Sequence, residues 1–205
     1  YSIGNTHNPA TFTFLTPAFD EEKTISGNRA KMMNLILDLK TMLEQFVPGQ
    51  VGRYDDTYNA RAFGDNIQKW GTATILFEAG EMPGDPEREY VRKLFFMALV
   101  QSLYVITEGL QEGGYEPYFK IPENNKYMCD KLVRGIRVGP VEVDLALNEV
   151  DDQYVLVDVG DLSNYSSYSV VEQEGVEYTG LSEQIRPDQP FDSTLLKSAD
   201  GSPVI

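Results

Sequence analysis

The chain has 205 residues, of which 41% are hydrophobic and 24% charged, so it can bury one large core or a core with an appendage. Its formal net charge is -15. Because such an acidic chain repels phosphate backbones and anionic lipid, we expect neither nucleic acid nor a membrane as a partner. No apolar run approaches the roughly 20 residues that a membrane span requires.

A single cysteine and a single histidine restrict the metal and redox chemistry of the chain. Cys129 cannot form an internal disulfide or a thiolate zinc cluster, and His7 cannot complete a two-histidine metal site. We predict that Cys129 is a small buried residue and not a nucleophile. The chain begins at Tyr1 without a methionine or signal peptide, and we expect a piece of a longer protein whose compartment is unknown.

The first predicted elements are a short extended segment and a long helix. The alternation from Thr11 to Leu15 predicts a strand or an extended loop. Asp20 is suited to be the N-cap of the helix, and Pro48-Gly49 should end it. The apolar residues of this helix recur at helical spacing and should share one face: Ile25, Met32, Ile36, Leu39, Leu43 and Phe46.

A buried strand and a second helix are predicted next. Thr72 to Phe77 is β-branched and apolar enough for a buried strand, and it ends in the lone acid Glu78. The second helix should begin at Asp85-Pro86, an N-cap followed by proline, and end at Gly109. Because its residues are apolar around most of its circumference, we expect it to be deeply buried.

The character of the chain changes after Gly113-Gly114, and we predict two domains, residues 1–115 and residues 116–205. The second is acidic and β-rich. Val133 to Val143 and Tyr154 to Val159 are typical of strands, with turn signals at the following dipeptides: Gly139-Pro140 and Asp151-Asp152. Residues 163–205 are rich in Ser, Glu, Asp, Gly and Pro and indicate an edge hairpin with a loose tail.

Polar side chains gather around the strand that ends in Glu78. A carboxylate at the edge of a buried strand loses contact with water, which favours proton uptake and suits a general base. The preceding loop, residues 53–66, brings tyrosine, aspartate, asparagine and arginine side chains to the same end of the sheet. We expect this loop to be mobile because it has few apolar residues. Acid, phenol and guanidinium together indicate part of an active site.

These segments carry a resemblance to a known family. The residues concerned are Asp55 to Gly71, Ile75 to Gly80 and Asp85 to Thr107. From about Tyr1 to Ile121 the chain resembles the C-terminal half of the catalytic domain of M14 zinc carboxypeptidases, closest to bacterial members with an extra C-terminal segment. The resemblance implies an α/β fold, in which a partial mixed-sheet carboxypeptidase-like domain precedes a small β-rich segment.

The resemblance also implies roles for individual residues. Glu78 matches the catalytic glutamate that follows a Phe-Glu strand end. Either Tyr54 or Tyr58 matches the tyrosine that closes over the substrate, and the spacing does not decide between them. Asp65 lies near the position of the residue at the floor of the side-chain pocket. Arg61 is a further candidate for substrate binding, with a solvated side chain or a pair with Asp55 or Asp56 as the alternative.

The zinc site of the family is missing from this chain. No His-x-x-Glu pair exists, since His7 is followed by Asn8-Pro9-Ala10, and the family's two substrate arginines precede Tyr1 in our alignment. An alternative alignment makes His7 the third zinc ligand. The resemblance therefore implies zinc in the parent enzyme, with none bound by this chain alone. The expected partners are a peptide substrate and the N-terminal part of the same protein.

Two functions remain open. The first is a metallocarboxypeptidase-like hydrolase in which this chain carries the general base and is inactive alone. The second is a non-catalytic module that binds peptides or proteins on a carboxypeptidase-like fold. A His-x-x-Glu pair and a later histidine in the upstream sequence would favour the enzyme. The sequence does not reveal which C-terminal side chain the enzyme would prefer.

Overall fold

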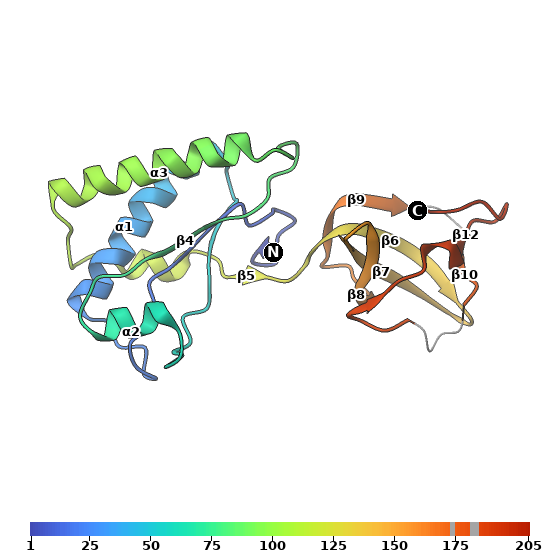
Figure 1. Cartoon of the computed structure of the whole chain (residues 1–205), viewed down its shortest axis with the longest axis horizontal. Coiled ribbons are helices and arrows are strands. Elements are labelled where there is room, and N and C mark those ends of the chain that lie inside the picture. Colours follow the sequence, from blue (N-terminus) through green and yellow to red (C-terminus); the bar gives the residue numbers. More distant parts are fainter. Residues whose placement is uncertain (173–174, 181–184) are drawn as a thin grey trace. The chain divides into compact units, whose positions relative to one another are not determined.

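The computed structural model describes residues 1–172, 175–180 and 185–205, and it divides into two compact units, Tyr1–Asn125 and Lys126–Ile205 (Figure 1). Both helices and mixed sheets are present, in agreement with the predicted α/β class. The boundary between the two units along the chain lies after residue 125, whereas the sequence suggested a boundary after residue 115. The segment between these positions belongs to the first unit because its short elements pair and pack there.

A three-stranded mixed sheet forms the centre of the first unit. Its middle strand β2 (Phe12–Leu15) pairs in parallel with β3 (Val51–Arg53) and antiparallel with β4 (Leu76–Ala79). The predicted strand near residues 11–15 is thus confirmed. A separate pair joins β1 (Ser2–Ile3) to β5 (Asn124–Asn125), so the end of the unit returns to its beginning.

Helix α1 (Gly27–Leu43) begins later than predicted. Its N-cap is Ser26, whose hydroxyl accepts a hydrogen bond from the Arg29 N–H, and not Asp20. The Asp20 carboxylate instead accepts a hydrogen bond from the Thr24 N–H. Asp20 therefore stabilises a turn before the helix, the competing local role that short acidic side chains often take.

Helix α3 (Glu89–Glu108) is close to the second predicted helix. Asp85 lies before its first turn, where its carboxylate accepts hydrogen bonds from the N–H groups of Tyr90 and Val91. Gly109, with φ 99°, ends the helix as predicted. The predicted deep burial is wrong, because the helix packs through one face whose buried residues are these: Val91, Leu94 and Ala98.

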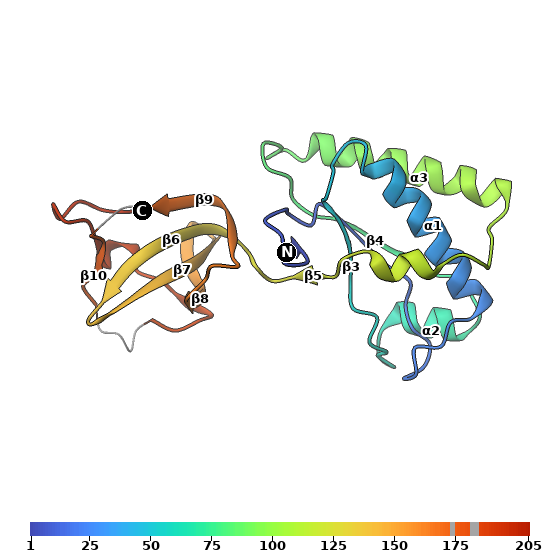
Figure 2. The same ribbon diagram turned by 180° about the vertical axis from the view of Figure 1, so that it is seen from behind.

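Helix α3 also corrects the prediction that no apolar run in this chain is long enough to span a membrane. By length and composition α3 is apolar enough to cross a membrane, and 17% of its most apolar stretch is buried. Its buried face packs in the core of the unit, next to α1 (Figure 2). Two short helices were not predicted: α2 (Phe63–Lys69) and the 3-10 helix η1 (Glu116–Lys120).

An aromatic column ties β4 to the core of the first unit. The ring of Phe77 stacks between those of Phe14 and Phe95, with centroid distances of 4.4 Å on both sides. Phe14 is fully buried on β2, and Phe95 comes from α3. Stacked rings at this separation gain energy beyond their burial, so the column fixes the position of β4 between β2 and α3.

The second unit is a curled mixed sheet. Strands β6 (Met128–Val138), β7 (Val141–Val150) and β8 (Gln153–Gly160) form an antiparallel meander. The predicted turns at Gly139-Pro140 and Asp151-Asp152 connect them, with both aspartates at positive φ. These strands and turns confirm the β-rich prediction for this part of the chain.

Within the described part of the last segment, β10 (Glu177–Tyr178) and β12 (Leu196–Lys197) form an antiparallel pair at the edge of the sheet, where the sequence predicted an edge hairpin. Strand β9 (Ser166–Glu172) pairs in parallel with β6. The other short elements are β11 (Gln189–Pro190) and the 3-10 helix η3 (Ser193–Leu195). Residues 173–174 and 181–184 of the predicted hairpin and tail lie outside the described residues. Cys129 on β6 is buried as predicted, and burial raises the pKa of its thiol.

Candidate functional site

Glu78 lies within β4, and this strand is not the buried strand that the sequence predicted. Leu76 and Glu78 are exposed, whereas Phe77 and Ala79 are half-buried. The preceding threonines do not join the sheet. The Thr72 N–H donates to the Ile67 carbonyl and the Thr74 N–H donates to the side chain of Gln68, so this stretch belongs to the end of α2. Glu78 therefore keeps its contact with water.

Close packing holds the end of β4 against β2. The Gly80 N–H donates a 2.8 Å hydrogen bond to the Thr11 carbonyl. A Cβ atom at Gly80 would lie 2.5 Å from the Ala10 carbonyl oxygen, a distance that real Cβ atoms do not adopt. Glycine is therefore required here so that the backbone beyond Glu78 can approach its neighbour.

Tyr54 is the one predicted site residue that the described structure joins to Glu78. Its hydroxyl donates a 2.7 Å hydrogen bond to Glu78 Oε2. Tyr54 follows β3, and its N–H donates to the Phe14 carbonyl, which places it beside β2. Thr13 on β2 lies opposite Gly52 on one side and Glu78 on the other. Tyr54 and Glu78 thus share one face of the sheet.

The surroundings of Tyr54 keep its phenol protonated. Burial, followed by the hydrogen bond to Glu78 and the charge of Glu78, raises the pKa of Tyr54 well above its usual range. Tyr1 packs edge-on against its ring, with centroids 5.8 Å apart. Asn124 adds a further amide close by and donates a 2.9 Å hydrogen bond to Thr13 Oγ1. Asn124 was not predicted as a site residue because no local sequence pattern marks it.

The other predicted site residues make contacts within their own loop and helix. Asp65 is buried in the first turn of α2, where its Oδ1 accepts a 3.0 Å hydrogen bond from the Asn59 N–H. Tyr58 lies beside Lys69, whose ammonium is 5.8 Å from the centre of its ring. Arg61 is exposed. In the part of the chain that is described, no hydrogen bond or ring contact brings Tyr58, Arg61 or Asp65 to Glu78.

A buried ion pair anchors the loop that we expected to be mobile. Asp56 is 7% exposed and pairs with the fully buried guanidinium of Arg29 and with Lys23 Nζ at 2.9 Å. Burial opposes ionisation, but the hydrogen bonds from Lys23 and Arg29 prevail and lower the pKa of Asp56. Arg53, at the beginning of the same loop, pairs with Glu123 at 2.6 Å.

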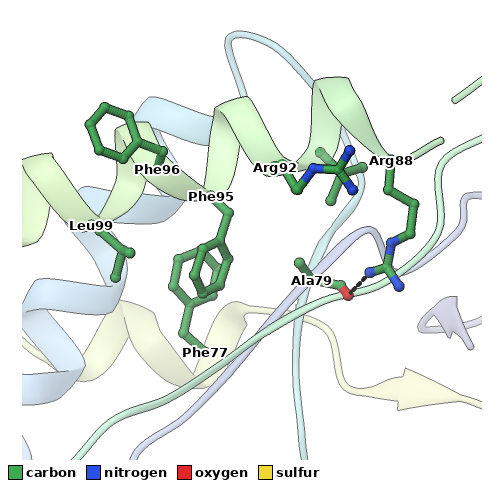
Figure 3. A pocket seen from close by; sticks show the side chains of 8 residues that line it. Phe77, Ala79, Arg88, Arg92, Phe95, Phe96 and Leu99 are labelled. Atoms are coloured by element: carbon green, nitrogen blue, oxygen red, sulfur yellow. Dashed lines mark hydrogen bonds between the residues drawn. The ribbon is translucent and has the colours of Figure 1, made fainter.

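An open apolar pocket of about 650 Å³ lies between β4 and α3 (Figure 3). Phe77 and Phe95 stack at its base, and Arg88 Nη2 donates a 2.5 Å hydrogen bond to the Ala79 carbonyl at one end. Its lining is Phe77, Ala79, Arg88, Val91, Arg92, Phe95, Phe96 and Leu99. The pocket lies on the α3 side of the strand that carries Glu78.

The described residues do not assemble a donor set for a metal. Within residues 1–172, 175–180 and 185–205, no group of three or more His, Cys, Asp or Glu side chains could hold a metal ion. Glu78, with Tyr54 on one oxygen, can accept a proton or orient a hydrogen-bonded group, but the described residues do not fit a zinc site around it.

Comparisons with known proteins identify no relative of the chain. No family model matches the chain, and no curated protein or solved structure is significantly similar to it. The likeness to M14 zinc carboxypeptidases therefore rests on sequence motifs alone.

Proposed function

We propose that the chain is the C-terminal part of a zinc metallocarboxypeptidase-like hydrolase that cleaves peptides at their C-terminus, with Glu78 as its general base. The Tyr54–Glu78 hydrogen bond carries this proposal. Glu78 is an exposed carboxylate on β4, and its sequence position resembles that of the catalytic glutamate of the M14 family. The assignment of this carboxylate as the general base rests on the motif, and the hydrogen bond from Tyr54 supports it.

The geometry suits proton transfer. The Tyr54 hydroxyl donates its hydrogen bond to Oε2 of Glu78 and fixes the orientation of the carboxylate. Oε1 remains available to take a proton from a nucleophile and return it to a leaving amine. Because the pKa of Tyr54 is raised, its phenol remains a donor and does not compete for that proton. Tyr54, rather than Tyr58, is the residue we assign to substrate contact beside Glu78.

The chain alone supplies only part of such a site. The described residues do not fit zinc, so we assign the zinc ligands and the groups that bind the substrate carboxylate to the N-terminal part of the same protein. We also propose a role in substrate binding for Arg61 and for Asp65, whose Oδ1 accepts a hydrogen bond from the Asn59 N–H. The isolated chain should be inactive.

The test is Glu78→Gln in the intact protein. Loss of a proton-transfer group should lower kcat by about 100-fold or more, while the zinc content stays the same. Glu81→Gln is the matched control, because Glu81 is an exposed acid just beyond the same strand. Unchanged turnover of C-terminal peptide substrates in Glu78→Gln would remove Glu78 from the role.

A non-catalytic module that binds a peptide or protein is the second candidate. The apolar pocket beside β4 and the exposed face of α3 favour it, since large exposed apolar surfaces mark interaction sites. An intact protein that binds peptides but lacks hydrolysis at stoichiometric zinc would select this function over the hydrolase.

A further inference from the structure

Asn124 lies on β5, and two neighbouring strands hold the backbone at this point. On one side, Ile3 of β1 is its register partner. On the other side, the residues just before β5 run beside β3 (Figure 2), where the Arg53 N–H donates a 3.0 Å hydrogen bond to the Pro122 carbonyl. Arg53 also forms a parallel bridge with Glu123. Because the backbone is paired on both sides, the side chain of Asn124 starts from a fixed position.

The side chain of Asn124 reaches the face of the sheet that carries Glu78. Its amide donates a 2.9 Å hydrogen bond to Thr13 Oγ1, and Thr13 is the register partner of both Gly52 and Glu78. Residues that pair directly across strands place their side chains on one face. A Cβ atom at Gly52 would lie 2.3 Å from Asn124 Oδ1. Glycine at this position therefore leaves the space through which the amide reaches the middle strand.

The amide of Asn124 also acts on the phenol of Tyr54. Burial, then Glu78 and Tyr1, raise the pKa of Tyr54, whereas the side chain of Asn124 lowers it. A neighbour lowers the pKa of a phenol when it donates a hydrogen to the phenol oxygen, because this stabilises the phenolate. An amide nitrogen carries two hydrogens, so one amide can serve both Thr13 and Tyr54.

One polar atom of this amide has no partner. Asn124 Oδ1 is buried, and none of the described residues forms a hydrogen bond with it. Because buried polar atoms are normally paired, an unpaired acceptor costs stability and needs a physical reason. The amide turns its donor side to Thr13 and its acceptor side to Gly52, which has no side chain to donate. The orientation of the amide thus favours the site at the expense of stability.

We propose that Asn124 is a positioning residue whose amide holds the phenol of Tyr54 against Glu78 and so fixes the carboxylate for proton transfer. A phenol oxygen that accepts a hydrogen from Asn124 directs its own single hydrogen to Glu78 Oε2. Consecutive hydrogen bonds polarise one another, which strengthens the last of them. This role rests on the proposed function, in which Glu78 is the general base.

The first test follows the ionisation of Tyr54 in the 205-residue chain and requires no activity. The NMR resonance of its ring carbon Cζ, assigned by its absence in Tyr54→Phe, reports the phenol, and Glu78→Gln brings its titration to lower pH. In that background, Asn124→Leu should raise the pKa of Tyr54, because the phenolate loses its donor. Mere loosening of the site would admit water and lower this pKa, since burial is the largest cause of its elevation. A lowered or unchanged pKa would overturn the proposal.

Two further variants test whether the effect passes through the amide. Gly52→Ala should also raise the pKa of Tyr54, because its new Cβ atom displaces the Asn124 amide. Asn125→Leu is the matched control on the same strand and should leave the titration unchanged, since the side chain of Asn125 donates to Asn5 Oδ1. Equal effects of Asn124→Leu and Asn125→Leu would contradict a specific contact.

The second test measures turnover in the intact protein. Asn124→Leu should lower kcat by about 10-fold, the scale of one lost hydrogen bond, at unchanged zinc content. In the Tyr54→Phe background the same substitution should have no further effect, because Asn124 acts through the phenol. An unchanged kcat, or full additivity of the two substitutions, would overturn the role. Unchanged turnover in Glu78→Gln would instead refute the proposed function, and the titration would still decide whether Asn124 holds Tyr54.

Discussion

Tyr54 and Glu78 meet across the middle strand of a three-stranded sheet, since Tyr54 follows β3 and Glu78 lies on β4. Thr13 of β2 is the register partner of both Gly52 and Glu78, which places the phenol and the carboxylate on the same face. A slip of one residue in either strand pair would turn one of these side chains to the opposite face. The pair therefore depends on the register of the whole sheet.

The ionisation of Tyr54 tests this contact directly. Burial and Glu78 raise the pKa of Tyr54, so Tyr54→Phe should not change the tyrosinate absorbance near the ordinary tyrosine pKa of about 10. Burial remains in Glu78→Gln, but the loss of the neighbouring charge should lower the pKa of Tyr54, which adds tyrosinate absorbance at a lower pH than in wild type. The double variant should lose this addition. A lower absorbance in Tyr54→Phe than in wild type would contradict the contact.

Gly80→Ala should disturb the pair from a distance. Its new Cβ atom would meet the Ala10 carbonyl oxygen, so β4 must shift away from β2 at a cost of about 1–3 kcal/mol in the free energy of unfolding. We also expect the shift to weaken the Tyr54–Glu78 hydrogen bond and lower the pKa of Tyr54. Gly113→Ala is the control, because its Cβ atom would meet nothing within 4 Å. Equal stability of the two variants, measured by urea unfolding, would contradict this account.

Asp56 should contribute to stability in a pH-dependent way. Its pKa is lowered in the folded chain, so its contribution is present above the unfolded pKa of about 3.9 and is lost as the pH falls through the lower folded value. At neutral pH, Asp56→Asn should destabilise the first unit by about 3–5 kcal/mol, because the buried charge of Arg29 loses its partner.

The exposed neighbour of Asp56 provides the matched control. Asp55 also contacts Lys23, but 61% of its side chain is exposed, and surface ion pairs contribute little. Asp55→Asn should therefore leave the unfolding midpoint in urea nearly unchanged. The difference between wild type and Asp56→Asn should shrink below about pH 4. A difference that stays constant down to acidic pH would show that ionised Asp56 is not responsible.

Sequence patterns predicted those parts of the fold that depend on local chemistry. Gly109 ends α3 and the Asp151-Asp152 turn joins two strands because backbone conformation at these positions is set by one or two residues. The predicted N-cap of α1, Asp20, was wrong because this side chain can accept a hydrogen bond from the Thr24 N–H as readily as it can cap a helix. Helix α2 was missed because its seven residues are too few for a clear period.

The long-range contacts of the site could not be predicted from the sequence. The choice between Tyr54 and Tyr58 depends on the pairing of β3 with β2, which joins residues far apart in the chain. Asn124 approaches the site through the pairing of β1 with β5, and no local signal indicates it. The deep burial of α3 was predicted because a helix that is apolar all round is normally enclosed. Its outer face is exposed because none of the described elements covers it.

The two units should unfold independently, because each closes its own hydrophobic core. The core of the first unit centres on α1 and β2, and the cores of the second lie within its sheet. We expect calorimetry to resolve two transitions. Leu39→Ala should lower only the transition of residues 1–125, and Leu132→Ala only that of residues 126–205, by about 2–5 kcal/mol each, since both side chains are buried. A single transition that both variants shift equally would mean that the units fold as one.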